Sequence, residues 1–229
     1  MRDGKPVYMN WTDVFHLAKK DEEAHKSYPL ICGYDCTGRH QAWVINQWLP
    51  NGRFHTYDEL YSEDTDVRTF LREVVKPFMW ANYNGLPMRV IADPAGKRRG
   101  DTDSRNAFLE AKSQGVTLHP AYSNTWDARY GAVNRLLIAS PIDGRGRYQL
   151  NPRCKILHKG FLGEYRLDRV QVSGQERFRD EPAKNKASHP HDGLQYSVMG
   201  TERGIEEFGR SSRHTARSQE PSPVMGAFT

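Results

Sequence analysis

The chain has 229 residues, of which 37% are hydrophobic and 27% charged, and its five tryptophans and eleven tyrosines can fill a core, so a disordered or fibrous chain is excluded. No apolar run approaches the roughly 20 residues that cross a bilayer, and the N-terminus lacks an apolar signal core, so we expect no membrane partner and no secretion. The net charge of +5 suits a nucleic-acid partner and equally suits a basic protein without one.

The cysteines Cys32, Cys36 and Cys154 are too few, and odd in number, for a disulfide scaffold, which indicates a reducing compartment. Cys32 and Cys36 could hold zinc together with His40. They lie in or just after a predicted strand, however, and no second pair of closely spaced cysteines follows. We therefore favour buried core cysteines over a zinc site.

Three strands are predicted early in the chain, after a lead-in segment, residues 1–28, that carries no chemistry. The first strand, residues 30–35, ends on Asp35, and its alternation places this acid on the same face as Gly33, which leaves open space beside the carboxylate. Two further strands are joined by an Asn-Gly turn and run antiparallel to their neighbours: residues 41–49 and 54–61.

The hydrophobic period then changes to that of a helix. Apolar residues recur at helical spacing over residues 67–79, and Pro77 inside this pattern predicts a kink or break. The strand that follows, residues 86–92, is expected to return parallel to the first strand and to end on Asp93. A helix, a short strand and a helix complete a mixed α/β layer arrangement: residues 104–113, 116–118 and 125–139.

Residues 141–187 are predicted to form a turn, a short strand, a short helix and a second strand. Arginine and lysine outnumber acids between Arg145 and Arg169, which suits a phosphate-backbone binder and equally a solvated surface.

The last predicted helix, residues 188–199, has Ser188 as its cap and carries Asp192 on the face that meets the sheet. We expect one domain over residues 29–200. The segment 201–229 is rich in Ser, Arg and Pro without periodicity, and we expect it to be a disordered tail.

Two strands and a helix thus deliver three acids, Asp35, Asp93 and Asp192. Three carboxylates that converge without partners repel one another unless a cation binds them, and Mg²⁺ or Mn²⁺ prefers such oxygen ligands. Two divalent ions about 3.5–4 Å apart can activate water and stabilise the leaving oxygen in phosphodiester hydrolysis. Taken singly, each acid could also be an ordinary strand-end, turn or helix-start residue.

Four segments carry a resemblance to a known family: ICGYDCTG, the strand end YDEL, VIADPAGKRRGDTDS and PAKNKASHPHDGLQYSVMG. In this order and spacing they resemble the C-terminal nuclease domain of tailed-bacteriophage large terminase subunits, over about residues 3–200. The resemblance implies an RNase H-like fold, with a central mixed sheet of five or more strands flanked by helices. It also implies a DNA endonuclease that cuts concatemeric viral DNA during genome packaging.

Carried over to this chain, the resemblance makes Asp35, Asp93 and Asp192 the catalytic, metal-binding acids of a site for two Mg²⁺ or Mn²⁺ ions. It implies double-stranded DNA, an ATPase domain, the portal protein and the small terminase subunit as partners. The location implied is the host cell cytoplasm, outside the mature virion. The sequence contains no GxxxxGK[ST] phosphate loop, so these residues cannot hydrolyse ATP for packaging.

Other residues have lesser roles in this hypothesis. Contacts to DNA are expected from basic residues near the acids: Lys97, Arg98, Arg99, Lys184, Lys186 and His189. Glu59 could add a fourth acid, although structural capping is favoured. His189 and His191 flank Asp192, and either could assist proton transfer or touch phosphate, although surface histidines are favoured. Arg129 is expected to pair structurally on its own helix.

Two alternatives remain open. The same fold could act on another substrate, a four-way junction or an RNA–DNA hybrid. The chain could instead be a non-catalytic module that binds DNA or the portal.

Overall fold

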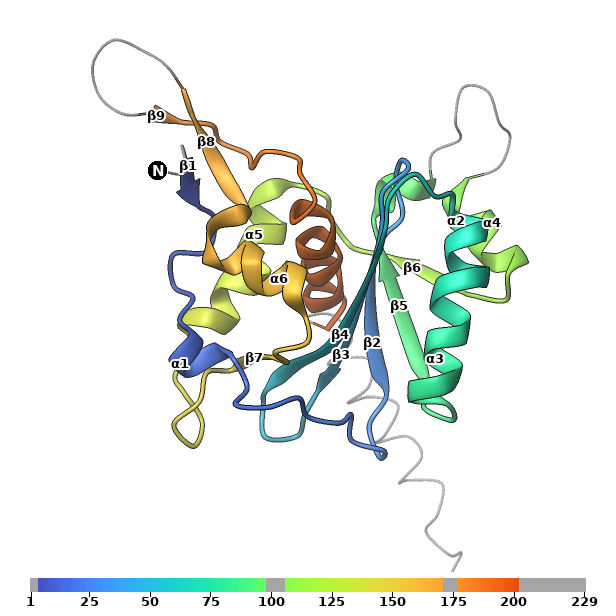
Figure 1. The fold of residues 1–229 in the computed structure, drawn as a ribbon, viewed down its shortest axis with the longest axis horizontal. Coiled ribbons are helices and arrows are strands. Elements are labelled where there is room, and N and C mark those ends of the chain that lie inside the picture. The colour runs from blue at the N-terminus through green and yellow to red at the C-terminus, as the bar shows by residue number, and fades with distance from the viewer. Residues whose placement is uncertain (1–3, 98–105, 171–176, 202–229) are drawn as a thin grey trace, which may run out of the picture.

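The computed structural model describes residues 4–97, 106–170 and 177–201, and a mixed sheet forms the centre of this part of the chain (Figure 1). Its six strands lie in the order β6-β5-β2-β3-β4-β7. The bounds are β2 (Leu30–Asp35), β3 (Gln41–Trp48), β4 (Phe54–Ser62), β5 (Met88–Ala92), β6 (Leu118–Pro120) and β7 (Tyr148–Leu150). The strands β2, β3 and β4 are antiparallel, whereas β5 is parallel to β2, β6 to β5 and β7 to β4. The expected α/β class with a central mixed sheet is therefore confirmed.

The turn between β3 and β4 has the predicted hairpin chemistry. Gly52 adopts a φ of +80°, a conformation that glycine reaches without the steric cost of a Cβ. The Asn51 side chain accepts a hydrogen bond from the backbone N–H of Arg53 at 3.1 Å. The Asn-Gly pair therefore sets the antiparallel pairing of these two strands.

The helix after β4 continues past Pro77, where a kink or break was expected. It consists of α2 (Val67–Phe70), a π-helical segment η1 (Leu71–Val75) and α3 (Lys76–Tyr83). In the π-helical segment the N–H of Lys76 reaches back to the carbonyl of Leu71. Pro77 then falls in the first turn of α3, where its missing N–H is tolerated. The wider turn thus replaces the expected break.

One face of the sheet is covered by α2, α3 and α4 (Ala107–Ser113) (Figure 1). Tyr34 and Phe70 stack in the core of this layer with ring centroids 5.9 Å apart. Asn106 caps α4 by accepting the N–H of Leu109 at 2.9 Å. The helix therefore begins later than the predicted residue 104, which lies outside the described residues.

The opposite face is covered by a layer that includes a helix over residues 188–201, which takes the colour of the chain's last described part in Figure 1. The described residues also form five other helical segments: α1 (Asp13–His16), η2 (Pro94–Lys97), α5 (Trp126–Ile138), α6 (Lys155–Lys159) and η3 (Gly160–Glu164). A small antiparallel sheet is formed by β1 (Gly4–Pro6), β8 (Arg166–Val170) and β9 (Arg177–Phe178). None of the described helices is long and apolar enough to cross a bilayer.

The early segment of the chain packs into the main core. Val7, Tyr8 and Trp11 are buried in the same cluster as the helices on this face. Trp11 stacks on Phe161 with the ring centroids 4.1 Å apart. The early segment therefore contributes side chains to the hydrophobic core on this face of the sheet.

The 188–201 helix touches β2 through backbone atoms. A Cβ built on Gly33 would lie 1.8 Å from the carbonyl oxygen of Gly193, so no side chain larger than hydrogen fits there. The expectation of open space beside Asp35 is wrong, because the helix backbone fills it. This contact brings the helix, and Asp192 with it, directly against the strand that carries Asp35.

The start of this helix is also set differently from the prediction. Asn185 caps it, since its side-chain oxygen accepts the N–H groups of Ala187 and Ser188 at 2.9 and 3.1 Å. The Ser188 hydroxyl instead donates to the Asn185 carbonyl at 2.7 Å. Pro190 lies in the first turn, as predicted.

Candidate metal centre

Asp35 and Asp93 lie side by side because they follow neighbouring parallel strands. Tyr34 of β2 is in register with Ala92 of β5, and the N–H of Asp93 donates to the carbonyl of Tyr34 at 3.2 Å. Both acids are buried, with exposed fractions of 3% and 5%. The sheet therefore delivers two carboxylates to one edge, as the strand pattern predicted.

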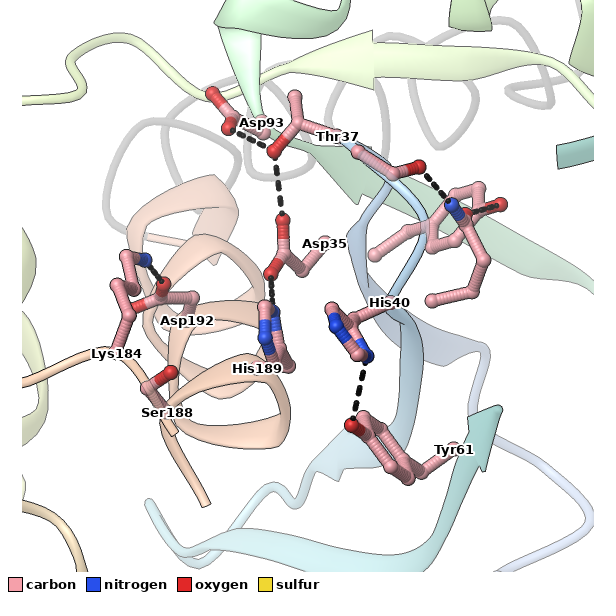
Figure 2. A network of polar contacts seen from close by, with 12 residues as sticks. Asp35, Thr37, His40, Tyr61, Asp93, Lys184, Ser188, His189 and Asp192 are labelled. Carbon is pink, nitrogen blue, oxygen red and sulfur yellow. Dashed lines mark hydrogen bonds and ion pairs between the residues drawn. The ribbon is translucent and has the colours of Figure 1, made fainter. Parts of the chain in front are cut away.

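Thr37 connects these two carboxylates (Figure 2). Its hydroxyl oxygen lies 3.2 Å from Asp35 Oδ1 and 3.3 Å from Asp93 Oδ2. One oxygen of each acid is thus directed at the same point in space. Thr37 had no role in the sequence analysis, although its place two residues after a strand-end acid was the available signal.

Asp93 also shapes the turn that follows it. Its Oδ1 accepts the N–H of Ala95 at 2.8 Å, and its carbonyl accepts the N–H of Gly96 at 3.0 Å. Asp93 therefore contributes to both the turn and the candidate site: Oδ1 accepts the hydrogen bond of the turn, and Oδ2 lies near Thr37.

His189 contacts Asp35 from the first turn of the 188–201 helix. Its Nδ1 lies 2.9 Å from Asp35 Oδ2 (Figure 2). The ring stacks on His40 with centroids 5.0 Å apart, and His40 Nδ1 lies 3.2 Å from the hydroxyl of Tyr61. Burial raises the pKa of Asp35, the hydrogen bond with His189 opposes this rise, and the charge of Asp192 adds to it.

Asp192 is the most enclosed of the three acids and is paired with two cations. Its Oδ1 accepts a hydrogen bond from Arg129 Nη1 at 2.6 Å, and its Oδ2 accepts one from Lys184 Nζ. The hydroxyl of Tyr165 lies 3.4 Å from the same Oδ1. The prediction that Arg129 pairs on its own helix is wrong, because its partner lies across the core. A charged residue on the apolar face of a helix with Trp126 was the signal that could have identified it.

The three predicted metal ligands differ in their contacts. Asp35 and Asp93 each direct one oxygen at the Thr37 hydroxyl, whereas Oδ2 of Asp192 contacts Lys184. Carboxylate oxygens are the ligands that a hard divalent ion prefers, so the residue types suit such an ion. Within residues 4–97, 106–170 and 177–201, however, no three His, Cys, Asp or Glu side chains gather closely enough to hold an ion as they stand.

The predicted DNA-contacting residues are divided. Lys184 and His189 contact the acids directly, as described above. Lys186 lies further out, with its ammonium 3.2 Å from Glu63 and 5.1 Å from the Tyr61 ring centroid. Lys97 ends η2 with its ammonium over the ring of Phe108. Arg98 and Arg99 lie outside the described residues.

Glu59 and His191 serve the structure around the site. Glu59 Oε1 and Oε2 accept the N–H groups of Ile156 and Leu157 at 2.5 and 2.8 Å, so it caps α6, and burial raises its pKa to about 7. His191 is fully buried, and burial lowers its pKa to about 3. The expectation of a surface histidine is therefore wrong for His191, whose Nε2 lies 3.2 Å from the carbonyl of Leu157.

The basic stretch between Arg145 and Arg169 is largely paired within the protein. Arg145 lies 2.9 Å from Glu22, Arg153 lies 2.9 Å from Asp58, and Arg147 donates to the carbonyl of Ser140 at 3.1 Å. These guanidiniums act as structural links between segments. The three cysteines are free and buried, as expected for core residues.

The strand order defines an RNase H-like α/β fold. Two buried acids lie at the ends of its adjacent parallel strands, and a third lies on the helix that packs against them.

No protein-family model and no curated protein matches the chain. Among solved structures, the crystal structure of the large terminase of bacteriophage HK97 is similar, with a TM-score of 0.51 and 11% sequence identity. The match covers 86% of this chain and 43% of that one, so this chain spans less than half the length of the HK97 protein. At this identity the likeness is one of fold.

Proposed function

We propose that this chain is the nuclease part of a phage large terminase, a divalent-metal-dependent DNA endonuclease that cuts concatemeric viral DNA during genome packaging. The observation that carries the proposal is the convergence of Asp35 and Asp93 on the Thr37 hydroxyl, with Asp192 on the adjoining helix. The fold shared with the HK97 large terminase supports the choice of a packaging nuclease.

In this proposal Asp35, Asp93 and Asp192 hold two Mg²⁺ or Mn²⁺ ions. Such ions, when bound, activate the attacking water and neutralise the leaving oxygen. Thr37 orients the two strand-end carboxylates through one hydroxyl group. His189, at 2.9 Å from Asp35, can hold or pass a proton beside the reacting phosphate. Arg129 holds the side chain of Asp192 in place by donating a hydrogen bond to Oδ1.

DNA binding is proposed for the exposed cations around the acids. Lys184 and Lys186 are exposed on the segment that leads into the 188–201 helix, and Lys97 is exposed at the end of η2. We include Arg98 and Arg99 in this set on sequence grounds alone. Contacts of this kind go to phosphates and carry no base information, so cleavage with little sequence preference is expected.

The assembly partners are also proposals: an ATPase domain, the portal protein, the small terminase subunit and double-stranded DNA. The match to 43% of the HK97 terminase supports a larger protein as the working unit. The working location would be the host cell cytoplasm, where concatemeric DNA is packaged.

A plasmid-nicking assay tests the proposal. Wild type is expected to nick supercoiled plasmid with Mn²⁺ or Mg²⁺ and not with EDTA, and Asp35→Asn is expected to lose at least about 100-fold in rate, as for loss of a metal-positioning group. Asp143→Asn is the matched control, because Asp143 is 83% exposed and pairs only at 3.8 Å with Arg53. Equal nicking by wild type and Asp35→Asn would reject the assignment. Four-way junctions and RNA–DNA hybrids cut in preference to duplex DNA would favour the alternative substrates.

A further inference from the structure

The two oxygens of Asp192 lie in different surroundings. Oδ1 faces the interior, where Arg129 Nη1 lies at 2.6 Å and the hydroxyl of Tyr165 at 3.4 Å. Oδ2 faces the other way and contacts only the ammonium of Lys184 among the contacts of the described residues. The carboxylate therefore has an inner oxygen that contacts buried side chains and an outer oxygen that contacts an exposed one. Figure 2 shows the contact of the outer oxygen with Lys184.

The two cations differ in how easily they can leave. The Arg129 side chain is 10% exposed, lies over the rings of Trp126 and Tyr196, and donates a second hydrogen bond to Gln195 at 3.1 Å. Removal of this guanidinium from the core would leave the buried oxygens of Asp192 and Gln195 without their donor. The Lys184 side chain is 66% exposed, so its ammonium can reach water when it leaves Asp192.

We propose that Lys184 is the built-in counter-ion of the metal centre, and that its ammonium and an incoming divalent ion compete for the outer oxygen of Asp192. This inference rests on the proposed function, because it requires that the three aspartates bind metal. Arg129 stays in place when the ion enters, so Asp192 offers the metal one oxygen only. The displaced ammonium is then free, beside the acids, for a phosphate oxygen of DNA.

A reciprocal effect follows from this competition. Any anion that draws Lys184 away from Asp192 strengthens metal binding, and metal binding strengthens the anion contact by the same factor. The aspartates would therefore bind the divalent ion weakly without DNA and more tightly when DNA is bound.

The test measures Mn²⁺ binding by the electron paramagnetic resonance signal of free Mn²⁺, without DNA. Lys184→Met keeps most of the side-chain length and removes the charge, and it is expected to bind Mn²⁺ about three- to tenfold more tightly than wild type, the range of a partly exposed ion pair. Lys112→Met removes the same charge from an exposed position of α4 and is expected to leave the affinity unchanged. In the absence of ions, Lys184→Met is expected to unfold at a lower temperature than wild type, and added Mn²⁺ is expected to raise its melting temperature by more.

The outcomes separate this inference from the proposed function. Mn²⁺ binding that is equal in wild type and Lys184→Met, and that Asp35→Asn abolishes, overturns the counter-ion role and leaves the nuclease proposal intact. Equal tightening in Lys184→Met and Lys112→Met also overturns it, since a general charge effect would then suffice. An absence of Mn²⁺ binding in wild type and in Lys184→Met overturns both.

Discussion

The three aspartates, although similar in burial, differ in their electrostatic partners. Asp35 has a histidine and a hydroxyl as partners, whereas Asp192 has a guanidinium and an ammonium. From the sequence alone, all three were expected to repel one another unless an ion binds them. The structure divides them, and substitutions at the two positions are therefore expected to change stability in opposite directions.

Asp35→Asn is expected to stabilise the ion-free protein at neutral pH. Burial raises the pKa of Asp35, so the folded state binds a proton more strongly than the unfolded state does. The stability that this group contributes is therefore present at low pH and decreases as pH rises from its unfolded value toward its folded value. Chemical denaturation with EDTA should show a larger free energy of unfolding for the variant at pH 7 than for wild type. A smaller value would mean that the contact with His189 outweighs the cost of burial.

Asp192→Asn is expected to destabilise the ion-free protein by about 3 kcal/mol, because it leaves the buried Arg129 without a countercharge. The same denaturation experiment measures this loss. In a double variant with Arg129→Met, the loss should be smaller than the sum of the two single effects. Additive effects would show that the two residues are not coupled.

His191 gives a prediction about acid stability. Burial lowers its pKa from the usual 6.5 to about 3, so the folded state excludes a proton that the unfolded state binds. Its contribution is therefore present above pH 6.5 and is lost as pH falls toward 3, with a slope of at most about 1.4 kcal/mol per pH unit. His191→Phe should flatten the dependence of unfolding free energy on pH in this window. His25→Phe, at an exposed histidine, should keep the wild-type slope, and equal slopes in all three proteins would contradict the prediction.

Some contacts of the site residues could be predicted from the sequence, and others could not. The neighbouring positions of Asp35 and Asp93 could be predicted, because an acid at the end of an apolar strand is visible in the sequence. The contacts of Arg129 with Asp192 and of Thr37 with Asp93 were not predicted, because these partners lie 63 and 56 residues away along the chain. Local patterns can mark such residues as unusual but do not identify their distant partners.

At the scale of elements, the contact between β2 and the 188–201 helix decides how the acids are spaced. Gly33→Ala would place a methyl group where the Gly193 carbonyl lies, so the helix must move away from the strand. The variant is expected to lose about 1–3 kcal/mol of stability and to bind Mn²⁺ more weakly than wild type.

The control for this variant is Gly131→Ala on α5. A Cβ at Gly131 would meet only the tip of the flexible Arg135 side chain, at 3.2 Å. Alanine in a helix is favoured over glycine by up to about 1 kcal/mol, so this variant should be as stable as wild type or more so. Thermal melts and Mn²⁺ binding of the two variants test the idea, and equal behaviour would show that the helix spacing is not critical.

Element boundaries were predicted well where the pattern was long. The predicted range 30–35 agrees with β2, and the hairpin of β3 and β4 follows from its Asn-Gly turn. The pairing of β1 with β8 was not predicted, because β1 has three residues and its partner lies far along the chain. The π-helical segment before Pro77 was also missed, since sequence periodicity cannot distinguish a wider turn from a break.

For the molecule as a whole, the proposed chemistry needs metal and DNA but not a nucleotide. The sequence contains no GxxxxGK[ST] loop, so ATP is expected to leave the rate of plasmid nicking by this chain unchanged at matched concentrations of free Mg²⁺. The measurement is the initial nicking rate with and without millimolar ATP. A rate that rises with ATP would require a nucleotide site that the sequence analysis did not recognise.

The meeting of Gly33 and Gly193 has a consequence for how such a protein can diverge. Where two main chains touch, the separation is set by atoms that every amino acid carries, and neighbouring side chains can change without altering it. Space therefore excludes a side chain at Gly33, whereas a Cβ at Gly193 would meet its nearest neighbours only at 3.3 Å. The separation of the strand from the helix thus depends mainly on one position of the sequence.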